Sequence, residues 1–313
     1  MAAVACAAAA LIVVLACTAP PPAAAGHFAT KVSPRYDRTV KCDLVDRLTE
    51  PPRLVIFGGS RAQRFEPSVA EKLTGLPAFN FAVQNSRPED AYAMARYLFW
   101  REPGVKLRCV WALQATTLSD SPLHPGLLAE RRLSQFLPEH LLGEQRKAVV
   151  NTAGREVGAD TQFTARGSLV RNAYDARVDR GVTLESRLVG YLAAMVPRAA
   201  SPAPYTKTRA KRYFERTLKL FNLHDVEPVI VIMPYHPTAL AAFRAVGWDA
   251  KEQELRSYLE SLRGAYRFHL LDYTDIAAFS GLEDAFYDGS HVTASNARRI
   301  LAQAVADAPE GFR

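Results

Sequence analysis

The chain has 313 residues, of which 49% are hydrophobic and 23% charged, and its formal net charge is +7. This composition excludes an intrinsically disordered chain and predicts one large globular domain with an insertion, or two small domains. The positive charge favours contact with anionic surfaces such as membrane headgroups, acidic glycopolymers or nucleic acid. The sequence has no run of Lys and Arg interleaved with aromatic residues and no nucleic-acid-binding motif, so we expect no nucleic acid partner.

The N-terminal segment 1–27 is predicted to direct export. Residues 1–25 carry no charged side chain, which fits a signal peptide cleaved after the small residues Ala23-Ala24-Ala25. An uncleaved membrane anchor also fits, since the apolar stretch is close to the length that spans a bilayer. Val14-Leu15-Ala16-Cys17 resembles a lipoprotein cleavage box, which would make Cys17 a lipidated N-terminus. We therefore expect an exported protein of the cell envelope, secreted or anchored, near a membrane surface.

After this segment, residues 28–52 are predicted to form a polar stalk with one short helix. From residue 53 onward, short apolar runs alternate with amphipathic stretches, a pattern typical of buried parallel strands and helices. The alternation predicts an α/β fold, a three-layer α/β/α sandwich around a five-stranded parallel sheet. The predicted strands are 53–57, 78–82, 107–113, 228–233 and 268–273, and the predicted helices between and after them are 61–73, 87–101, 207–223, 251–263 and 293–306.

Residues from about 114 to 205 break the alternation. This segment is rich in Arg, Pro, Gly and Ser, and its helical stretches lie near 127–137 and 184–195. Long segments without secondary structure are uncommon in compact domains, so we predict a helical insertion above the sheet edge, a candidate lid. Residues 53–313 then form one domain that contains the insertion.

Cys42 and Cys109 are the two cysteines beyond the N-terminal segment. In an exported protein they could form a disulfide, and the alternative is two unrelated buried thiols. No C-x-x-C pair and no His/Cys spacing in the sequence predicts a metal site, so we expect neither a metal nor a cofactor.

The candidate site begins where the first predicted strand ends, in Phe57-Gly58-Gly59-Ser60-Arg61. Its glycines permit a tight strand-to-helix turn, and Ser60 with Gln63 fits a capping-box pattern. Asp288 and His291 follow the last predicted strand, and the carboxyl ends of parallel strands lie at one edge of a sheet. The three residues predict acyl transfer, in which His291 takes the Ser60 proton and Asp288 orients the imidazole.

These segments, with Asn80-Phe81-Ala82 and Pro234-Tyr235-His236-Pro237, resemble the SGNH (GDSL-type) hydrolase superfamily from about Arg35 to the C-terminus. Within this superfamily, the chain resembles the envelope-anchored branch that includes the lipoteichoic acid D-alanylation protein and related acyltransferase-like proteins. The resemblance implies a flavodoxin-like sheet with Ser60 as the nucleophile and Asp288 and His291 as its partners. It also implies a membrane O-acyltransferase partner that supplies the acyl group.

Two positions depart from the superfamily pattern. Asn85 stands where such proteins place a glycine of the oxyanion hole, and asparagine tolerates a left-handed backbone better than most residues. Gln114 lies in the stretch that replaces the superfamily's G-x-N-D block, and its amide could donate to an oxyanion.

Gly59 is a further candidate for this role, and His236 is either a substrate contact or a turn residue between prolines. Arg61 and Arg87, which follow strand ends, either meet an anionic substrate or have solvated or capping roles.

The sequence predicts an exported serine esterase or O-acyltransferase that acts on acyl groups of cell-envelope glycopolymers or lipids. The loss of one oxyanion donor typically lowers the rate by about a hundred- to a thousandfold. The departures therefore keep a second hypothesis open, a catalytically silent SGNH-like scaffold that binds glycan or organises an envelope complex.

Overall fold

The computed structural model describes residues 27–28, 37–119, 121–142, 161–201 and 209–313. The predicted export segment lies outside these residues except for its last position. Among the helices of the described part, none is both long and apolar enough to cross a bilayer.

The centre of the fold is a five-stranded parallel sheet made of β2 (Leu54–Phe57), β3 (Ala78–Asn80), β4 (Arg108–Leu113), β7 (Val229–Ile232) and β8 (His269–Asp272). The strands pair in the order β3-β2-β4-β7-β8, all parallel, which is the flavodoxin-like order. β2 and β7 are buried along their whole length, as expected when both faces of the central strands are covered. The predicted fold class is confirmed.

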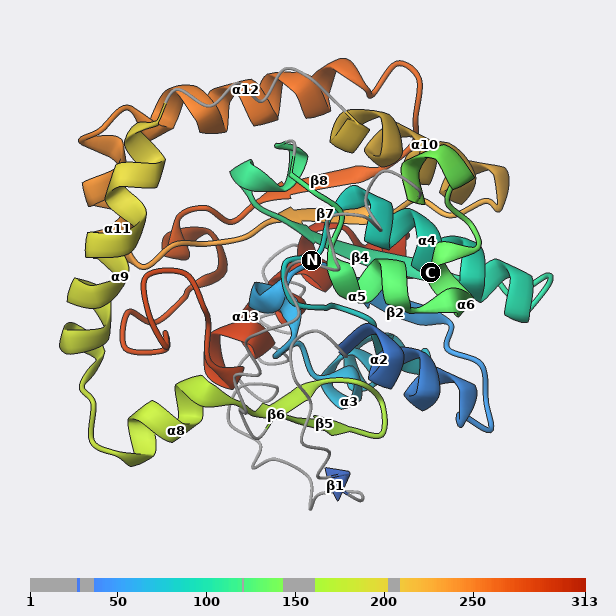
Figure 1. The fold of residues 1–313 in the computed structure, drawn as a ribbon, viewed down its shortest axis with the longest axis horizontal. Coiled ribbons are helices and arrows are strands. Elements are labelled where there is room, and N and C mark those ends of the chain that lie inside the picture. The colour runs from blue at the N-terminus through green and yellow to red at the C-terminus, as the bar shows by residue number, and fades with distance from the viewer. Residues whose placement is uncertain (1–26, 29–36, 120, 143–160, 202–208) are drawn as a thin grey trace, which may run out of the picture.

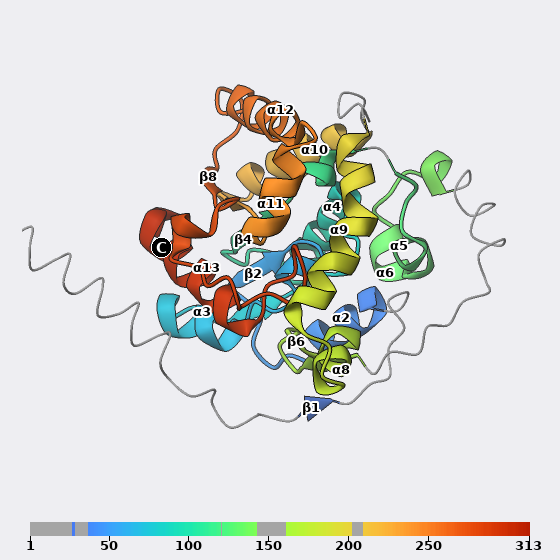
Figure 2. The same ribbon diagram turned by 90° about the vertical axis from the view of Figure 1, so that its left-hand side faces the viewer.

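Helices cover both faces of this sheet (Figures 1 and 2). One face packs against α3 (Pro67–Thr74) and α13 (Ala294–Asp307), and the other packs against α4 (Pro88–Arg101) and α10 (Arg209–Leu223). Because the connections between parallel strands cross the sheet, this distribution leaves the carboxyl edge open for a site.

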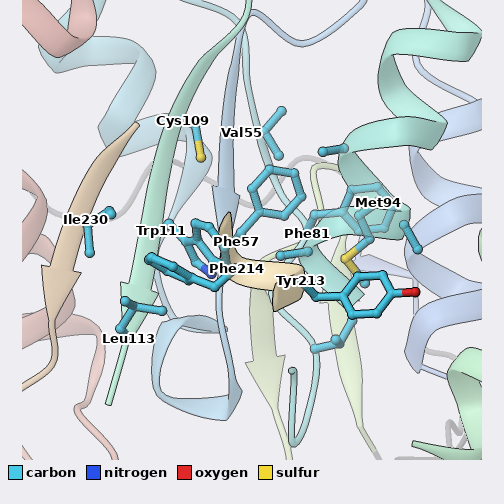
Figure 3. Close-up of a cluster of buried hydrophobic side chains, with 14 of the residues drawn as sticks. Val55, Phe57, Phe81, Met94, Cys109, Trp111, Leu113, Tyr213, Phe214 and Ile230 are labelled. Atoms are coloured by element: carbon cyan, nitrogen blue, oxygen red, sulfur yellow. The ribbon is translucent and has the colours of Figure 1, made fainter. Parts of the chain in front are cut away.

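Side chains alternate between the two apolar layers along each strand. In β4, Val110 and Ala112 join the layer of α3 and α13, whereas Trp111 and Leu113 join the layer of α4 and α10. The Trp111 ring lies 4.6 Å from that of Phe214 in α10, beside Phe57 of β2 (Figure 3). Trp111 is therefore a core residue whose strand ends at the sheet edge.

The turn that contains Ser60 and the helix after it are two elements, whereas the sequence predicts one helix over 61–73. A 3-10 turn (Ser60–Ala62) follows β2, and α3 begins only at Pro67. Proline has no N–H and a fixed φ, so it suits the first position of a helix and not the interior of a longer one.

The insertion between β4 and α10 is not purely helical, so the prediction was incomplete. It contains a short antiparallel hairpin, β5 (Gln162–Thr164) and β6 (Leu169–Arg171), and β1 (His27–Phe28) pairs with β5. Strands of two or three residues are too short to show alternation in a sequence. Two helices follow the hairpin, α8 (Ala173–Asp179) and α9 (Leu184–Ala200).

Two further regions refine the predicted helices. The stretch expected at 127–137 is two short helices, α5 (Pro125–Ala129) and α6 (Arg131–Ser134). The long helix after β7 is α12 (Trp248–Ser261), and it is preceded by α11 (Pro237–Arg244), which the sequence analysis does not predict.

The predicted stalk is part of the domain wherever it is described. α2 (Asp37–Asp46) packs into the core through Cys42 and Val45, which are fully buried. Its Arg38 and Lys41 side chains are also fully buried, although their sequence reads as a solvated face. The burial of this helix therefore cannot be predicted from its charged composition.

Cys42 and Cys109 are free thiols, and both are buried. Burial raises the pKa of each thiol well above its ordinary value. The disulfide alternative is wrong, and the alternative of two unrelated buried thiols is the correct one.

Candidate active site

Ser60 lies at the carboxyl edge of the sheet, directly after β2. Gly58, two positions earlier, has a φ of 150°, and a Cβ on it would lie 2.9 Å from the Ala112 Cβ. The strand can therefore turn here only with glycine. Gly59 has open space around it and occupies the N-cap position of the 3-10 turn. The capping box predicted for Ser60 and Gln63 does not form, because no side chain caps this turn.

The Ser60 hydroxyl is hydrogen-bonded to the histidine 231 positions further along the chain. Its Oγ lies 2.8 Å from His291 Nε2, and His291 Nδ1 lies 2.9 Å from Asp288 Oδ2. With the carboxylate accepting from Nδ1–H, the Nε2 lone pair faces the hydroxyl and can take its proton. The structure thus brings the three predicted residues together in the order of a nucleophile, a base and an orienting acid.

Asp288 is held by the loop that it starts. Its Oδ1 accepts hydrogen bonds from the backbone N–H groups of Ser290 and His291, both at 2.8 Å. Burial opposes the charge of this carboxyl, but the interaction with His291 and the two N–H groups lower its pKa to about 2. Asp288 is therefore ionised at neutral pH and can stabilise the imidazolium that forms when His291 takes a proton.

His236 lies behind this loop and does not line the cavity beside Ser60. Its backbone N–H donates to the Gly289 carbonyl at 3.1 Å, and its Nδ1 accepts from Thr238 N at the start of α11. Burial lowers the pKa of His236, which favours the neutral ring that this acceptor role requires. Its role is therefore structural, which agrees with the predicted alternative of a turn residue between prolines. The hydrogen bond to the Gly289 carbonyl connects it to the Asp288 loop.

Gly289 is required by the close approach of the insertion. A Cβ at this position would lie 2.3 Å from the ring of Tyr191 in α9 and 2.9 Å from the Ala239 Cβ in α11. Any larger residue would push the loop away from one of these helices, and His291 would move with it.

A cavity of about 30 Å³ opens beside Ser60. This is room for one or two water molecules or a small acyl group. Asn85 and Gln114 contribute to its wall, so both predicted positions lie at the site. Asn85 has a φ of 51°, the left-handed conformation that lets asparagine replace glycine in this turn.

The backbone N–H groups of Ser60 and Asn85, two residues that line this cavity, are candidates to stabilise an oxyanion. The Ser60 N–H is the first of the 3-10 turn, and the first N–H groups of a helix have no partner within it. The Asn85 N–H donates to no other residue of the described part of the chain. The Gln114 backbone N–H is engaged with Thr117 Oγ1 at 3.0 Å, so from this residue only the side-chain amide, the donor that the sequence analysis considers, is left for an oxyanion.

Arg61 and Arg87 line the cavity, and their guanidinium groups contact other residues of the protein. The Arg61 guanidinium lies 4.1 Å from the centre of the Tyr235 ring and is buried. Arg87 Nη1 donates to the Thr116 carbonyl at 3.3 Å. These contacts give both arginines structural partners.

The insertion reaches the triad through α8 and α9, which run along one side of the domain (Figures 1 and 2). The ring of Tyr174 in α8 lies 4.7 Å from the His291 ring, centre to centre. The next residue, Asp175, accepts from the Tyr287 hydroxyl at 2.7 Å, and Arg187 Nε donates to the Tyr287 carbonyl at 2.7 Å. The insertion is predicted to lie above the sheet edge, but Tyr174 is not predicted as a site residue. No motif or hydrophobic periodicity in the sequence marks this tyrosine.

Within the described residues, no group of three or more His, Cys, Asp or Glu side chains is arranged to hold a metal ion. The chemistry that Ser60, His291 and Asp288 can support through their own hydrogen bonds is proton transfer and nucleophilic attack. Comparison of the sequence with models of known families and with curated proteins finds no match.

Proposed function

We propose that this protein is an exported serine esterase or O-acyltransferase that acts on acyl groups of cell-envelope glycopolymers or lipids. The observation that carries the proposal is the continuous hydrogen-bonded path from Ser60 Oγ through His291 to Asp288, with contacts of 2.8 and 2.9 Å. Both contacts lie in the range expected between a nucleophile, its base and the group that orients the base.

In the proposed reaction, Ser60 Oγ attacks the carbonyl carbon of a bound ester while His291 Nε2 takes the hydroxyl proton. The carbonyl oxygen becomes an oxyanion, which the N–H groups of Ser60 and Asn85 stabilise from the cavity wall. His291 then gives the proton to the leaving alkoxide, and the acyl group remains on Ser60 as an ester. A hydroxyl of water or of an acceptor sugar attacks this acyl-serine, with His291 again as the base.

Whether the second attack comes from water or from a sugar decides between an esterase and an acyltransferase. The Tyr174 ring lies 4.7 Å from the His291 ring, so the insertion covers part of the base. A base shielded in this way would favour transfer to a bound acceptor over attack by water. A membrane O-acyltransferase partner that supplies the acyl group is part of the same proposal, and so is action at the membrane surface of the cell envelope.

The proposal is tested with p-nitrophenyl acetate and two serine variants. Ser60→Ala removes the nucleophile and is expected to abolish turnover above the uncatalysed rate. Ser68→Ala is the matched control, because Ser68 is a half-buried serine of α3 and alanine favours a helix. Equal turnover by the parent and by Ser60→Ala would refute the proposal.

The stretch that starts at Gln114 supports a second candidate function, a catalytically silent scaffold that binds glycan. The superfamily's G-x-N-D block is replaced there, and the Gln114 N–H is already hydrogen-bonded to Thr117. Such a scaffold would be folded and would retain acetylated glycan on an affinity column, while the parent protein would show no turnover that Ser60→Ala removes.

A further inference from the structure

Three buried charged side chains gather on one helix outside the triad. Asp37, Arg38 and Lys41 of α2 have exposed fractions of 2%, 0% and 0%. Burying a charge is unfavourable unless it is paired and hydrogen-bonded, so each of these groups must have a fixed partner. Their hydrogen-bond partners connect α2 to two turns that line the cavity, the turn that contains Asn85 and the turn that starts at Ser60.

Two carboxylates hold the turn that contains Asn85 at both of its ends. Asp37 Oδ2 accepts from the Gln84 N–H at 2.5 Å, one position before Asn85. Asp90 Oδ2 accepts from the Arg87 N–H at 2.8 Å, two positions after it. The backbone on either side of Asn85 is thus bound to an anionic acceptor, and such charge-assisted hydrogen bonds are stronger than neutral ones.

Arg38 joins these two carboxylates. It donates from Nη1 to Asp37 Oδ1 at 3.0 Å and from Nε to Asp90 Oδ1 at 2.7 Å. Burial opposes the charge of Arg38, but Asp90 and Asp37 raise its pKa, so the guanidinium stays charged. The guanidinium has a fixed planar fork, and it therefore sets the distance between Asp37 and Asp90.

Lys41, one turn further along α2, holds the other side of the cavity. Its Nζ donates to the Asn80 carbonyl at 2.7 Å. The Asn80 side-chain amide in turn donates to the carbonyls of Ala62 and Phe65, both at 2.8 Å. Ala62 closes the 3-10 turn that starts at Ser60, so this chain of contacts runs from α2 to the nucleophile turn.

We propose that α2 is a positioning element of the active site, in which Asp37 and Arg38 hold the Asn85 turn where its N–H can stabilise the oxyanion. This inference rests on the proposed function. A left-handed conformation is unfavourable for a residue with a side chain, so the Asn85 turn needs support from its surroundings. Oxyanion donors also have to be held within about 0.5 Å of the productive geometry, which a freely moving turn would not achieve.

The test compares two Asp→Asn variants of the same helix. Asp37→Asn keeps the size of the side chain and removes the charge that binds Gln84 N–H and Arg38. We expect kcat for p-nitrophenyl acetate to fall about 10- to 100-fold, with KM within about threefold, because the oxyanion exists only after substrate is bound. Asp46→Asn is the matched control, since Asp46 pairs with Arg132 at 2.9 Å away from the cavity, and its kcat should stay within about twofold of the parent.

A double-mutant cycle separates positioning from general stability. Asn85→Val disrupts the turn directly, because a β-branched residue does not adopt the left-handed conformation. If Asp37 acts through this turn, Asp37→Asn lowers kcat by no more than about two- to threefold in the Asn85→Val background. Independent losses that multiply in the double variant would overturn the inference, and so would an unchanged kcat in Asp37→Asn.

Arg38→Lys provides the second variant should Asp37→Asn fail to fold. It keeps the positive charge and loses the fork that joins the two carboxylates, so the same fall in kcat without a change in KM is expected. Parental kcat in a folded Arg38→Lys protein would overturn the inference and leave the proposed function intact. A parent protein that shows no Ser60-dependent turnover would instead refute the proposed function, and this inference with it.

Discussion

Two parts of the candidate site, the Asp288 loop and the turn that contains Asn85, are held in place by different means. The loop from Asp288 to His291 is fixed mainly by hydrogen bonds among its own four residues, with Asp288 as the acceptor. The turn that contains Asn85 is fixed by side chains of other elements, and Asp37 lies 47 positions from the Gln84 that it binds. The support of the Asp288 loop can be predicted from a four-residue motif. The support of the Asn85 turn comes from contacts between distant segments, which form only when the chain folds.

The largest effect on kcat is expected for the Asp288 loop, which is held by its own hydrogen bonds. Asp288→Asn should lower kcat by about ten-thousandfold, because an amide neither selects the required tautomer of His291 nor stabilises the imidazolium. The measurement is kcat with p-nitrophenyl acetate, and Asp284→Asn is the control because Asp284 is exposed. A loss of less than about tenfold would show that the Asp288 loop does not orient the base.

In the turn that lines the cavity, the backbone of Asn85 should matter more than its side chain. Asn85→Val is expected to lower kcat about a hundredfold, which is the usual effect of losing one oxyanion donor. Asn85→Gly should stay within a few-fold of the parent, since glycine adopts a positive φ readily. An equal loss in both variants would assign the role to the amide side chain and would contradict a role for the backbone N–H.

The contact between the insertion and the triad should have a smaller effect. Tyr174→Ala removes the ring beside His291 and is expected to lower kcat about tenfold by loosening the base. Tyr174→Phe keeps the ring but loses the interaction of the hydroxyl with the Asp288 carboxylate, so its kcat should fall by less than that of Tyr174→Ala. If Tyr174→Phe is as impaired as Tyr174→Ala, the hydroxyl and not the stacked ring is what the triad needs.

The smallest effect concerns stability and tests the buried charges of α2. Burial lowers the pKa of Lys41 to about 7 from 10.5, so between these two pH values the unfolded chain binds more protons than the folded one. The free energy of unfolding should therefore gain up to about 1.4 kcal/mol per pH unit from this group as pH rises through that window.

Lys41→Met removes the titrating group and should remove this gain. Urea unfolding of parent and variant at pH 7 and pH 9 measures the difference between the two slopes. Identical pH dependence in the two proteins would mean that Lys41 keeps its ordinary pKa and is not buried as described.

Much of the fold is predictable from the sequence, because buried parallel strands are short apolar runs. β4 and β7 lie within the predicted 107–113 and 228–233. The same reasoning predicts that Ser60, Asp288 and His291 meet, since Ser60 follows β2 and the other two lie in the segment after β8, and both strands end at a common edge.

The missing parts share one property, which is that they depend on contacts between distant segments. α2 has the charged sequence of an exposed helix, and only the partners of Asp37 and Arg38 explain its burial. The β5–β6 hairpin is too short to carry a period, and Tyr174 has no pattern around it. Gly289, likewise, is required because Tyr191 and Ala239, which are distant in the sequence, pack against it.

The most direct test of the account is covalent labelling of Ser60 by a fluorophosphonate probe, mapped by peptide mass spectrometry in the parent and in His291→Ala. The account predicts that the probe modifies Ser60 in the parent and that labelling is lost in the variant, since His291 must take the hydroxyl proton for attack to occur. A parent that is not labelled, or equal labelling in both proteins, would contradict it.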